Sequence, residues 1–436
     1  MDELLLTGIF IAVLFFLLGS GVWVGLSLIG VALTGMLLFT TRPAGDAMVT
    51  TIWTKSSSWS LTALPLFIWM GEILFRTRLS ADLFRGLAPW MGGLPGRLLH
   101  VNVAGCALFA AISGSSAATV ATVGKMSIPE LRQRRYPEMM IIGTLAGAGT
   151  LGLLIPPSII LIVYGVTVNE SITRLFMAGI LPGIMLAGLF MGYIILGALL
   201  RPDSMPPPEP HTGLAQKIRE SLYLLPVIGL IVLVLGSIYF GVATATEAAV
   251  LGVAGALILA AVQGSLDWTG FRESLMGATR TSCMIALILA GSSFLSLSMG
   301  FTGLPRELAA WIASLELTPL TLILALTVFY VVLGCFLDGI SAVVLTMAVV
   351  EPMIRQAGLD MIWFGIYLVI VVEMAQITPP IGFNLFVLQG MTRHQITYIA
   401  RAAMPMFFIM CVAVALVVAF PQIALFLPEH MVQGPR

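Results

Sequence analysis

Residues 4–41 form a stretch without a single charged side chain. A helix that crosses a bilayer needs about 20 apolar residues, so this stretch has room for two crossings, with Gly19-Ser20-Gly21 as the natural break. Further apolar runs follow at 59–75, 139–168, 175–200, 220–238, 242–262, 281–300, 361–390 and 402–425. Such a succession predicts an all-α polytopic membrane protein.

The composition supports this class. Hydrophobic residues make up 59% of the 436-residue chain and charged residues 10%, against roughly 25% in an ordinary soluble domain. The 21 basic and 21 acidic residues balance, so no net charge attracts nucleic acid. The four Cys and four His are scattered without a zinc or haem motif. The start, Met1-Asp-Glu-Leu-Leu, lacks the basic segment of a removable signal peptide.

Two stretches are too long for one crossing and too short for two. Thirty-four residues separate Arg97 from Arg132, and another 34 separate Glu316 from Glu351. Two crossings need about 40 residues and a turn, whereas one crossing would put Arg97 and Arg132 on opposite faces. A re-entrant hairpin turns at membrane depth and leaves on its own face, which is tolerated where protein surrounds it. We expect such hairpins at about 98–131 and 317–350.

Two proline pairs predict broken helices beside these hairpins. Pro156-Pro157 lies in the apolar run 139–168, and Pro379-Pro380 lies in the run 361–390. Proline lacks the amide hydrogen that a helix interior needs, yet it fits the first turn of a helix. Each run is therefore predicted to form two half-helices with an unwound middle near the bilayer midplane.

These features repeat at an offset of 223 residues. Three prolines of the first half have a proline at that offset in the second half: Pro129, Pro156 and Pro157. Each half is expected to hold five crossings and one hairpin. Because five is odd, the halves must be inverted relative to each other, which is typical of secondary transporters.

The distribution of basic residues predicts the orientation. Fourteen of the 21 fall on the face that holds both ends of the first hairpin, Lys125 lies within a hairpin arm, and six fall on the other face: Arg42, Lys55, Arg174, Arg306, Arg355 and Arg436. Cytoplasmic loops carry the excess, so the first face is expected to be cytoplasmic and both termini to lie outside. The first inverted repeat then covers 1–200, a cytoplasmic linker 201–219 and the second inverted repeat 220–436.

Small polar residues mark the turn of each hairpin. Ser113-Gly114-Ser115-Ser116 forms the first tip, and Asp338-Gly339-Ile340-Ser341 forms the second. Their oxygens and the unwound carbonyls of the breaks are suited to a hard cation such as sodium, and half-helix N-termini favour an anion. The alternative is that small residues only allow tight helix packing.

Three carboxylates lie deep in apolar sequence, where a charge costs roughly 2.5–3.5 kcal/mol on insertion scales unless it is paired or protonated. For Asp338 we favour cation coordination. Glu373, five residues before Thr378, is interpreted as a satisfied packing carboxylate, with a proton-relay role as the alternative. Glu247 is interpreted as structural and bonded to a neighbouring helix, and Glu72 as an ordinary residue near the interface.

Five stretches resemble the large membrane subunit of a TRAP (tripartite ATP-independent periplasmic) transporter. They are Ser113-Gly-Ser-Ser-Ala-Ala-Thr119, Leu154-Ile-Pro-Pro-Ser158, Thr244-Ala-Thr-Glu-Ala248, Gly334-Cys-Phe-Leu-Asp338 and Ile377-Thr-Pro-Pro-Ile-Gly-Phe-Asn-Leu-Phe386. The last is the most specific, and the resemblance covers essentially the whole chain. One departure is Ala245, where the family often has proline.

This resemblance implies a mechanism and a set of residues. Sodium drives import of an organic acid by an elevator motion of the hairpins and broken helices. A periplasmic binding protein captures the acid, and a separate small four-helix subunit completes the membrane part. The first sodium site of the family maps onto Ser113, Ser115, Gly152, Ile155 and Pro157. For the second site, Asp338 and Thr378 match, and Gly339 and Pro380 follow by repeat symmetry. The candidates for the substrate region are Ser116, Ser158 and Asn384.

The sequence therefore predicts the large permease subunit of a sodium-coupled, binding-protein-dependent importer of small carboxylates, in the inner membrane of a bacterium or archaeon. No cofactor is expected besides the coupling ions. The absence of a P-loop argues against an ATP-driven pump, unless a separate subunit supplies the motor. Two alternatives stay open: a stand-alone sodium/anion symporter, and an intramembrane enzyme with Asp338 and Glu373 as acid and base.

Overall fold

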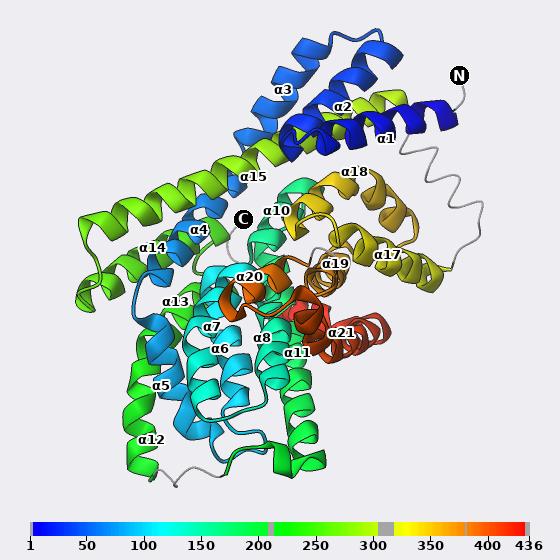
Figure 1. The fold of residues 1–436 in the computed structure, drawn as a ribbon. Helices are drawn as coiled ribbons and strands as arrows, with labels where there is room; N and C mark the ends of the chain where they lie inside the picture. Colours follow the sequence, from blue (N-terminus) through cyan, green and yellow to red (C-terminus); the bar gives the residue numbers. More distant parts are fainter. Residues whose placement is uncertain (1–2, 208–212, 304–317, 380–381, 432–436) are drawn as a thin grey trace.

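The computed structural model describes residues 3–207, 213–303, 318–379 and 382–431 (Figure 1). Within these ranges all regular structure is helical. Six of the described helices are long and apolar enough to cross a membrane, and eight if each of two bent pairs counts as one span. The shorter apolar helices have 10–17 residues. The chain is thus an all-α polytopic membrane protein, and the five crossings per half stay a prediction.

One group of helices, which we call the frame, is built around the 35-residue helix α15 (Trp268–Thr302). Three helices of the frame contact α15, and α14 packs on α4 (Figure 1). Gly25 lets α2 approach α15 closely, because a Cβ there would lie 2.8 Å from the carbonyl oxygen of Leu287. The other members are α1 (Glu3–Gly19), α2 (Val24–Phe39), α3 (Ala44–Ser56), η1 (Trp59–Thr62), α4 (Ala63–Phe75), α13 (Leu225–Tyr239) and α14 (Ala245–Val262).

The second group, which we call the core, contains the segments predicted as hairpins and broken helices. From the first half it takes α6 (Leu99–Ser113), α7 (Ser116–Gln133), α8 (Glu138–Gly149), α9 (Leu151–Leu154), α10 (Ile159–Val168) and α11 (Ile172–Leu200). From the second half it takes α17 (Pro319–Gly334), α18 (Gly339–Gln356), α19 (Met361–Gln376), α20 (Phe383–Thr392), α21 (Ile396–Ala419) and α22 (Gln422–His430). All 16 residues of α19 are buried, so this helix forms the centre of the core.

Helices of the two halves correspond in register. The ends of α7 and α18 lie 223 residues apart, as do the starts of α8 and α19. In addition, α7 packs against α20 and α18 packs against α10, so one arm of each hairpin contacts the broken helix of the other half. An internal repeat predicts this pattern, and the inversion of the halves across the membrane stays a prediction.

Helices also form in three segments that lack an apolar run and are therefore expected to be connections between crossings. These are α3, α5 (Leu79–Met91) in the basic stretch after α4, and α12 (Leu214–Ser221) in the expected linker, between η2 (Pro202–Ser204) and η3 (Leu222–Leu224). Arg85 of α5 pairs with Glu220 of α12 at 2.5 Å, and Trp90 Nε1 donates to Ser221 Oγ at 2.6 Å. Polar side chains hide such helices from a search for apolar runs. For the same reason α15 begins 13 residues before the run predicted at 281–300.

Candidate functional site

The first tip is the two-residue turn between α6 and α7. Gly114 has a φ of +58°, a left-handed conformation that glycine adopts without the penalty of a Cβ. Ser115 is the N-cap of α7, and its hydroxyl accepts from the amide of Ala118 at 3.5 Å. Ser113 Oγ lies 2.9 Å from Thr119 Oγ1, which donates to the carbonyl oxygen of Ser115 at 2.8 Å. Hydroxyl and carbonyl oxygens therefore gather at the start of α7.

This tip packs directly against the first broken helix. Gly152 of α9 abuts it, because a Cβ at this position would lie 2.6 Å from the carbonyl oxygen of Ser115. Gly114 faces the break, since its own Cβ would lie 2.7 Å from the carbonyl oxygen of Pro157. Of the residues assigned to the first sodium site, Ser115, Gly152 and Pro157 are therefore brought together, and Ser113 belongs to the same turn.

The first break covers residues 155–158, between α9 and α10. Ile155 has extended backbone, with ψ of 126°, and its side chain packs toward α11. Ser158 is fully buried and links the two half-helices. Its hydroxyl donates to the carbonyl oxygen of Leu153 and accepts from the amide of Leu161 at 3.4 Å. The Ser158 hydroxyl is therefore already bonded within the break, which limits its direct use toward a substrate.

The second tip is a four-residue turn, 335–338, between α17 and α18. Asp338 is exposed and caps α18, since its carboxylate accepts from the amide of Ser341 at 3.1 Å. An N-cap carboxylate is stabilised by the positive end of the helix dipole. Gly339 packs on α19, where a Cβ would lie 2.8 Å from Cγ1 of Val372. The predicted cation ligand Asp338 thus has a partner in its own helix.

Thr378 lies in the second break, between α19 and α20. Its hydroxyl donates to the carbonyl oxygen of Ala375 at 2.8 Å and lies 3.4 Å from Cys335 Sγ of the second tip. Among the described residues no hydrogen bond joins Asp338 to Thr378. Pro380, the last residue assigned to the second sodium site, lies outside the described residues. The second tip and its break therefore meet through Cys335 and Thr378.

A buried hydrogen bond joins the two halves. Ser116 Oγ donates to Oε1 of Glu373 on α19 at 2.6 Å. Glu373 is 1% exposed, and its Oε2 has no hydrogen-bond partner in the described part of the chain. The expectation of a satisfied packing carboxylate is wrong for this oxygen, because the surrounding side chains supply no donor. The sequence signals only the depth of Glu373, since its partner is 257 residues away.

Other buried polar groups nearby also lack partners. Asn384 of α20 is fully buried, and neither its amide oxygen nor its amide nitrogen has a partner within the described ranges. The same holds for Gln376 Nε2 on α19 and Ser341 Oγ on α18. A buried polar atom without a bond costs free energy, so such atoms mark positions that a ligand, an ion or water completes. Ser341, which the sequence places in the second tip, and Gln376, which no sequence pattern singles out, therefore join Asn384 as candidates for the substrate region.

Two other acidic residues singled out from the sequence have local partners. Glu247 completes a capping box, in which its Oε2 accepts from the amide of Thr244 at 2.8 Å. The expectation that it bonds to a neighbouring helix is wrong, because its position in the first turn of α14 lets it fold back onto its own N-cap. Glu72 pairs with Arg76 one turn later in α4.

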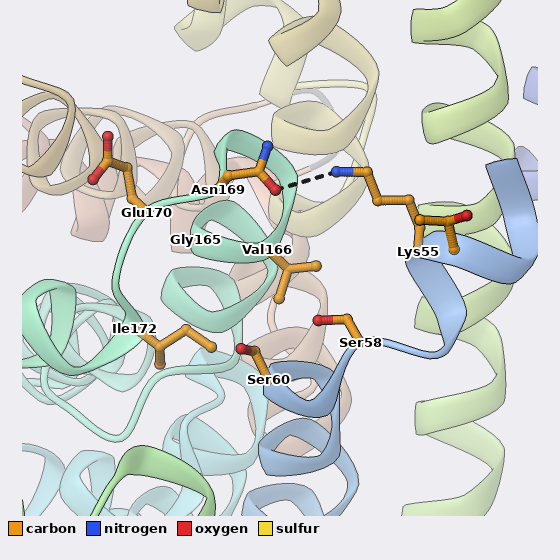
Figure 2. A pocket seen from close by; sticks show the side chains of 9 residues that line it. Lys55, Ser58, Ser60, Gly165, Val166, Asn169, Glu170 and Ile172 are labelled. Atoms are coloured by element: carbon orange, nitrogen blue, oxygen red, sulfur yellow. Dashed lines mark hydrogen bonds between the residues drawn. The ribbon is translucent and has the colours of Figure 1, made fainter. Parts of the chain in front are cut away.

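A polar pocket of about 330 Å³ lies between α3 of the frame and the turn after α10 (Figure 2). Lys55 reaches across it and donates to Asn169 Oδ1 at 3.3 Å. Glu170 also lines the pocket, but its carboxylate pairs with Arg355 at 3.6 Å. Among the described residues no carboxylate pairs with Lys55, so its charge meets a neutral amide. Hydroxyl residues line the frame side: Thr54, Ser58 and Ser60.

Comparisons relate the chain to known proteins. Residues 11–423 match the family model described as "Tripartite ATP-independent periplasmic transporter, DctM component". The chain is 31% identical to the C4-dicarboxylate TRAP transporter large permease protein DctM of Pseudomonas aeruginosa, over 86% of this chain and 88% of that protein. It is 30% identical to the isethionate TRAP transporter permease protein DctMQ of Oleidesulfovibrio alaskensis, over 95% and 64% respectively.

Among solved structures, the YdaH transporter of Alcanivorax borkumensis superimposes with a TM-score of 0.66. The match covers 94% of this chain and 98% of that one, at 13% sequence identity. At this identity the similarity is one of fold alone.

Proposed function

Because the chain belongs to the DctM family, the large permease component of tripartite ATP-independent periplasmic transporters, we propose that it carries out sodium-coupled import of small organic acids that a separate binding protein delivers. The chain is a multi-pass membrane transporter subunit and not an enzyme, in line with its relatives. The two relatives above are named for C4-dicarboxylate and isethionate, both small organic anions, which supports an anionic cargo.

The observation that best supports sodium coupling is the contact between the first tip and the first break. Ser113 and Ser115 supply hydroxyl and carbonyl oxygens beside Gly152 and Pro157. The last carbonyls of a helix lack partners within it and carry partial negative charge, and α9 ends at this break. Sodium needs several such oxygens where water is scarce. We place the first sodium ion here, with Ile155 contributing from the extended backbone.

We place a second sodium ion at the second tip and break. Asp338 supplies a formal negative charge, and Thr378 supplies a buried hydroxyl. Gly339 and Pro380 complete the set by the repeat. In this half the charge compensates the cation, whereas the first site relies on neutral oxygens.

The substrate belongs between the two ion sites. Asn384 supports this placement, since both of its buried amide atoms lack partners within the described ranges, as do Gln376 Nε2 and Ser341 Oγ. An amide can donate to a carboxylate, and the N-termini of half-helices attract the same charge. Ser116 and Ser158 sit at the N-terminal ends of α7 and α10 and contribute through those helix ends.

The Lys55 pocket supports a route for an anion toward this region. α10 begins at the first break and ends beside Asn169, so its 10 residues connect the break to the pocket over about 15 Å. On the basic-residue count, Lys55 lies on the outer face. A cation that meets only a neutral amide attracts an incoming carboxylate, and the pocket has room for a small one.

The proposed membrane arrangement has two inverted halves in the inner membrane, with both termini outside and an elevator motion of the core against the frame. Single cysteines introduced near Arg97 and near Arg134 then react with an impermeant reagent only from the cytoplasm. Labelling from opposite sides would contradict the first hairpin and the inversion with it.

Reconstitution tests the proposed function directly. We expect uptake of radiolabelled organic acids into proteoliposomes to require an inward sodium gradient, a small four-helix membrane subunit and a periplasmic binding protein. The chain without partners is the control. Strong sodium-driven uptake by the chain alone would favour a stand-alone symporter, and equal uptake with potassium in place of sodium would contradict sodium coupling.

A further inference from the structure

Glu373 lies in the contact between the two halves. It belongs to α19, which is buried along its whole length, and it accepts the 2.6 Å bond from Ser116 at the first position of α7. Within the described ranges this hydroxyl is its single hydrogen-bond partner, and Oε2 has none. The carboxyl group thus joins an arm of the first hairpin to the broken helix of the second half.

The charged groups of the neighbouring elements do not compensate Glu373. The cations on α7 and on the helices packed against α19 are all exposed, and none of them pairs with it: Lys125, Arg132, Arg174, Arg355 and Arg401. The acids on these elements are Glu130 and Glu351, which pair with Arg134 and Arg355, and the exposed Glu429. The remaining titratable groups there, none bonded to Glu373, are Tyr164, Tyr193, Tyr330, Tyr367, Tyr398, Cys411 and His430.

An ionised carboxylate in this position would have one neutral hydroxyl and the partial positive charge at the N-terminus of α7 for compensation, but no full opposite charge. A buried charge without an opposite charge is strongly disfavoured, and the group becomes neutral instead. A neutral carboxylic acid fits the observed geometry. Its O–H on Oε1 donates to Ser116 Oγ over the same distance, and Oε2 is left as an uncharged carbonyl oxygen.

We propose that Glu373 is a proton-binding site that works beside the sodium sites, holding a proton in the state described here, where Ser116 bonds to it, and releasing it in the other state of the transport cycle. Binding forms one O–H bond at the carboxylate, and release returns the proton to water. The inference that Glu373 is protonated depends only on the geometry around it. The inference that this proton is coupled to transport rests on the proposed sodium-driven import.

Infrared spectroscopy of the purified full chain tests the protonation without any transport. At about pH 7, where exposed carboxyl groups are ionised, we expect a carboxylic-acid C=O band that Glu373→Gln removes and Glu429→Gln, at an exposed carboxyl, leaves in place. Ser116→Ala keeps the band but shifts its frequency, because the hydrogen bond is lost. This second variant keeps the test valid if Glu373→Gln fails to fold.

Three infrared results would overturn the proposal: no such band in the wild type, a band that persists unchanged in a folded Glu373→Gln, or a band that disappears when sodium is added at constant pH. The last result would show that sodium, and not a proton, is the cation that binds at Glu373.

Transport tests the coupling separately. With the partners and an organic acid that passes the uptake test above, sodium-driven uptake should acidify the lumen of vesicles loaded with a pH indicator. Glu373→Gln should lose this acidification. Each pH unit above the midpoint lowers the protonated fraction about tenfold, so uptake slows with rising pH in the wild type and not in Glu373→Gln. Acidification that is equal in both would overturn the coupling role. Absence of sodium-driven uptake in the wild type would contradict the proposed function and leave the infrared result intact.

Discussion

The two hairpin tips differ in construction although their helices correspond in register. The first is a two-residue turn in which Ser115 lies against Gly152 and Gly114 lies against Pro157, so oxygens of the tip meet the break through backbone contacts. The second is a four-residue turn whose charged residue, Asp338, is exposed and caps its own helix. The first tip is thus neutral and packed on its break through backbone atoms, whereas the second carries an exposed charge and meets its break through the side chains of Cys335 and Thr378. Of the two proposed sodium sites, the first is therefore distinguished by backbone approach and the second by charge.

The two breaks differ in the same sense. In the first, the Ser158 hydroxyl bonds to both half-helices. In the second, Gly382 precedes α20 without a side-chain cap, and a Cβ there would lie 2.7 Å from the carbonyl oxygens of Gln376 and Thr378. At Gly382, the N-cap of α20, there is therefore no room for a capping side chain such as that of Ser158 in the first break.

The largest expected effect is that of Gly152→Ala. The new Cβ would meet the carbonyl oxygen of Ser115 at 2.6 Å, and because that atom belongs to the backbone, the tip must move. We expect the sodium concentration for half-maximal uptake to rise more than about tenfold, equivalent to about 1.4 kcal/mol. Gly188→Ala, in open space on α11, is the matched control. An unchanged sodium response in Gly152→Ala would contradict the close approach of tip and break.

Asp338→Asn separates the role of this side chain as the cap of α18 from the effect of its negative charge. Asparagine caps a helix about as well as aspartate, so α18 keeps its N-cap while the negative charge is lost. We expect an increase of about tenfold in the sodium concentration for half-maximal uptake, with thermal stability unchanged. Asp338→Ala should give the same sodium response and lose about 1 kcal/mol of stability as well. If Asp338→Asn behaves like the wild type in sodium-titrated uptake, Asp338 is a cap and no more.

Gly339→Ala should raise the sodium concentration for half-maximal uptake less than Gly152→Ala does, which tests the difference between the two tips. Its Cβ would meet Cγ1 of Val372, a side-chain atom that can move, at 2.8 Å. We expect about a threefold increase in the sodium requirement, typical of mild overpacking. Equal damage from both alanine substitutions would show that the two tips approach their breaks equally closely.

Ser158→Ala should act on stability. It removes the cap of α10 and the bond to Leu153, so we expect a loss of about 1 kcal/mol, measured by thermal unfolding in detergent. Ser171→Ala, which removes the exposed cap of α11, is the comparison and should lose less. A Ser158→Ala protein as stable as the wild type would show that the first break holds together without this hydroxyl.

The smallest effect belongs to Lys55→Gln. Glutamine keeps a donor for Asn169 and removes the charge, so the KM for the anionic substrate should rise about twofold, as expected for a half-buried charge that solvent still screens. The sodium response should stay unchanged, because the pocket lies at the far end of α10. An unchanged KM would remove the pocket from the substrate route.

Features that depend on local chemistry could be read from the sequence. The breaks at Pro156 and after Thr378 are predicted because the proline pairs lack the amide hydrogen that a helix needs. The turn at Gly114 is predicted because glycine adopts a left-handed backbone without penalty. Helices α6 and α7 begin and end within two residues of the predicted limits 98 and 131, and the re-entrant path of this pair through the membrane stays a prediction. The start of the second hairpin, at 317, lies outside the described residues.

Features that depend on distant contacts could not be read in this way. The bond between Ser116 and Glu373 joins residues that are 257 positions apart, and no pattern in either segment signals it. The charge of Asp338 within apolar sequence predicts a cation ligand, but the sequence does not show that the same carboxylate caps α18. A search for apolar runs does not find helices α5 and α12, because polar and charged side chains such as Arg85 and Glu220 make the contact between them.

The expected effects of these substitutions depend on sodium binding where the first tip meets the first break. Equilibrium binding of ²²Na⁺ to the purified chain tests it most directly, with the wild type, a Ser113→Ala/Ser115→Ala variant and the exposed Glu429→Gln control. We expect saturable sodium binding that potassium does not displace, weakened about tenfold, or about 1.4 kcal/mol, in the serine variant and unchanged in the control. Identical isotherms for the wild type and the serine variant would contradict it.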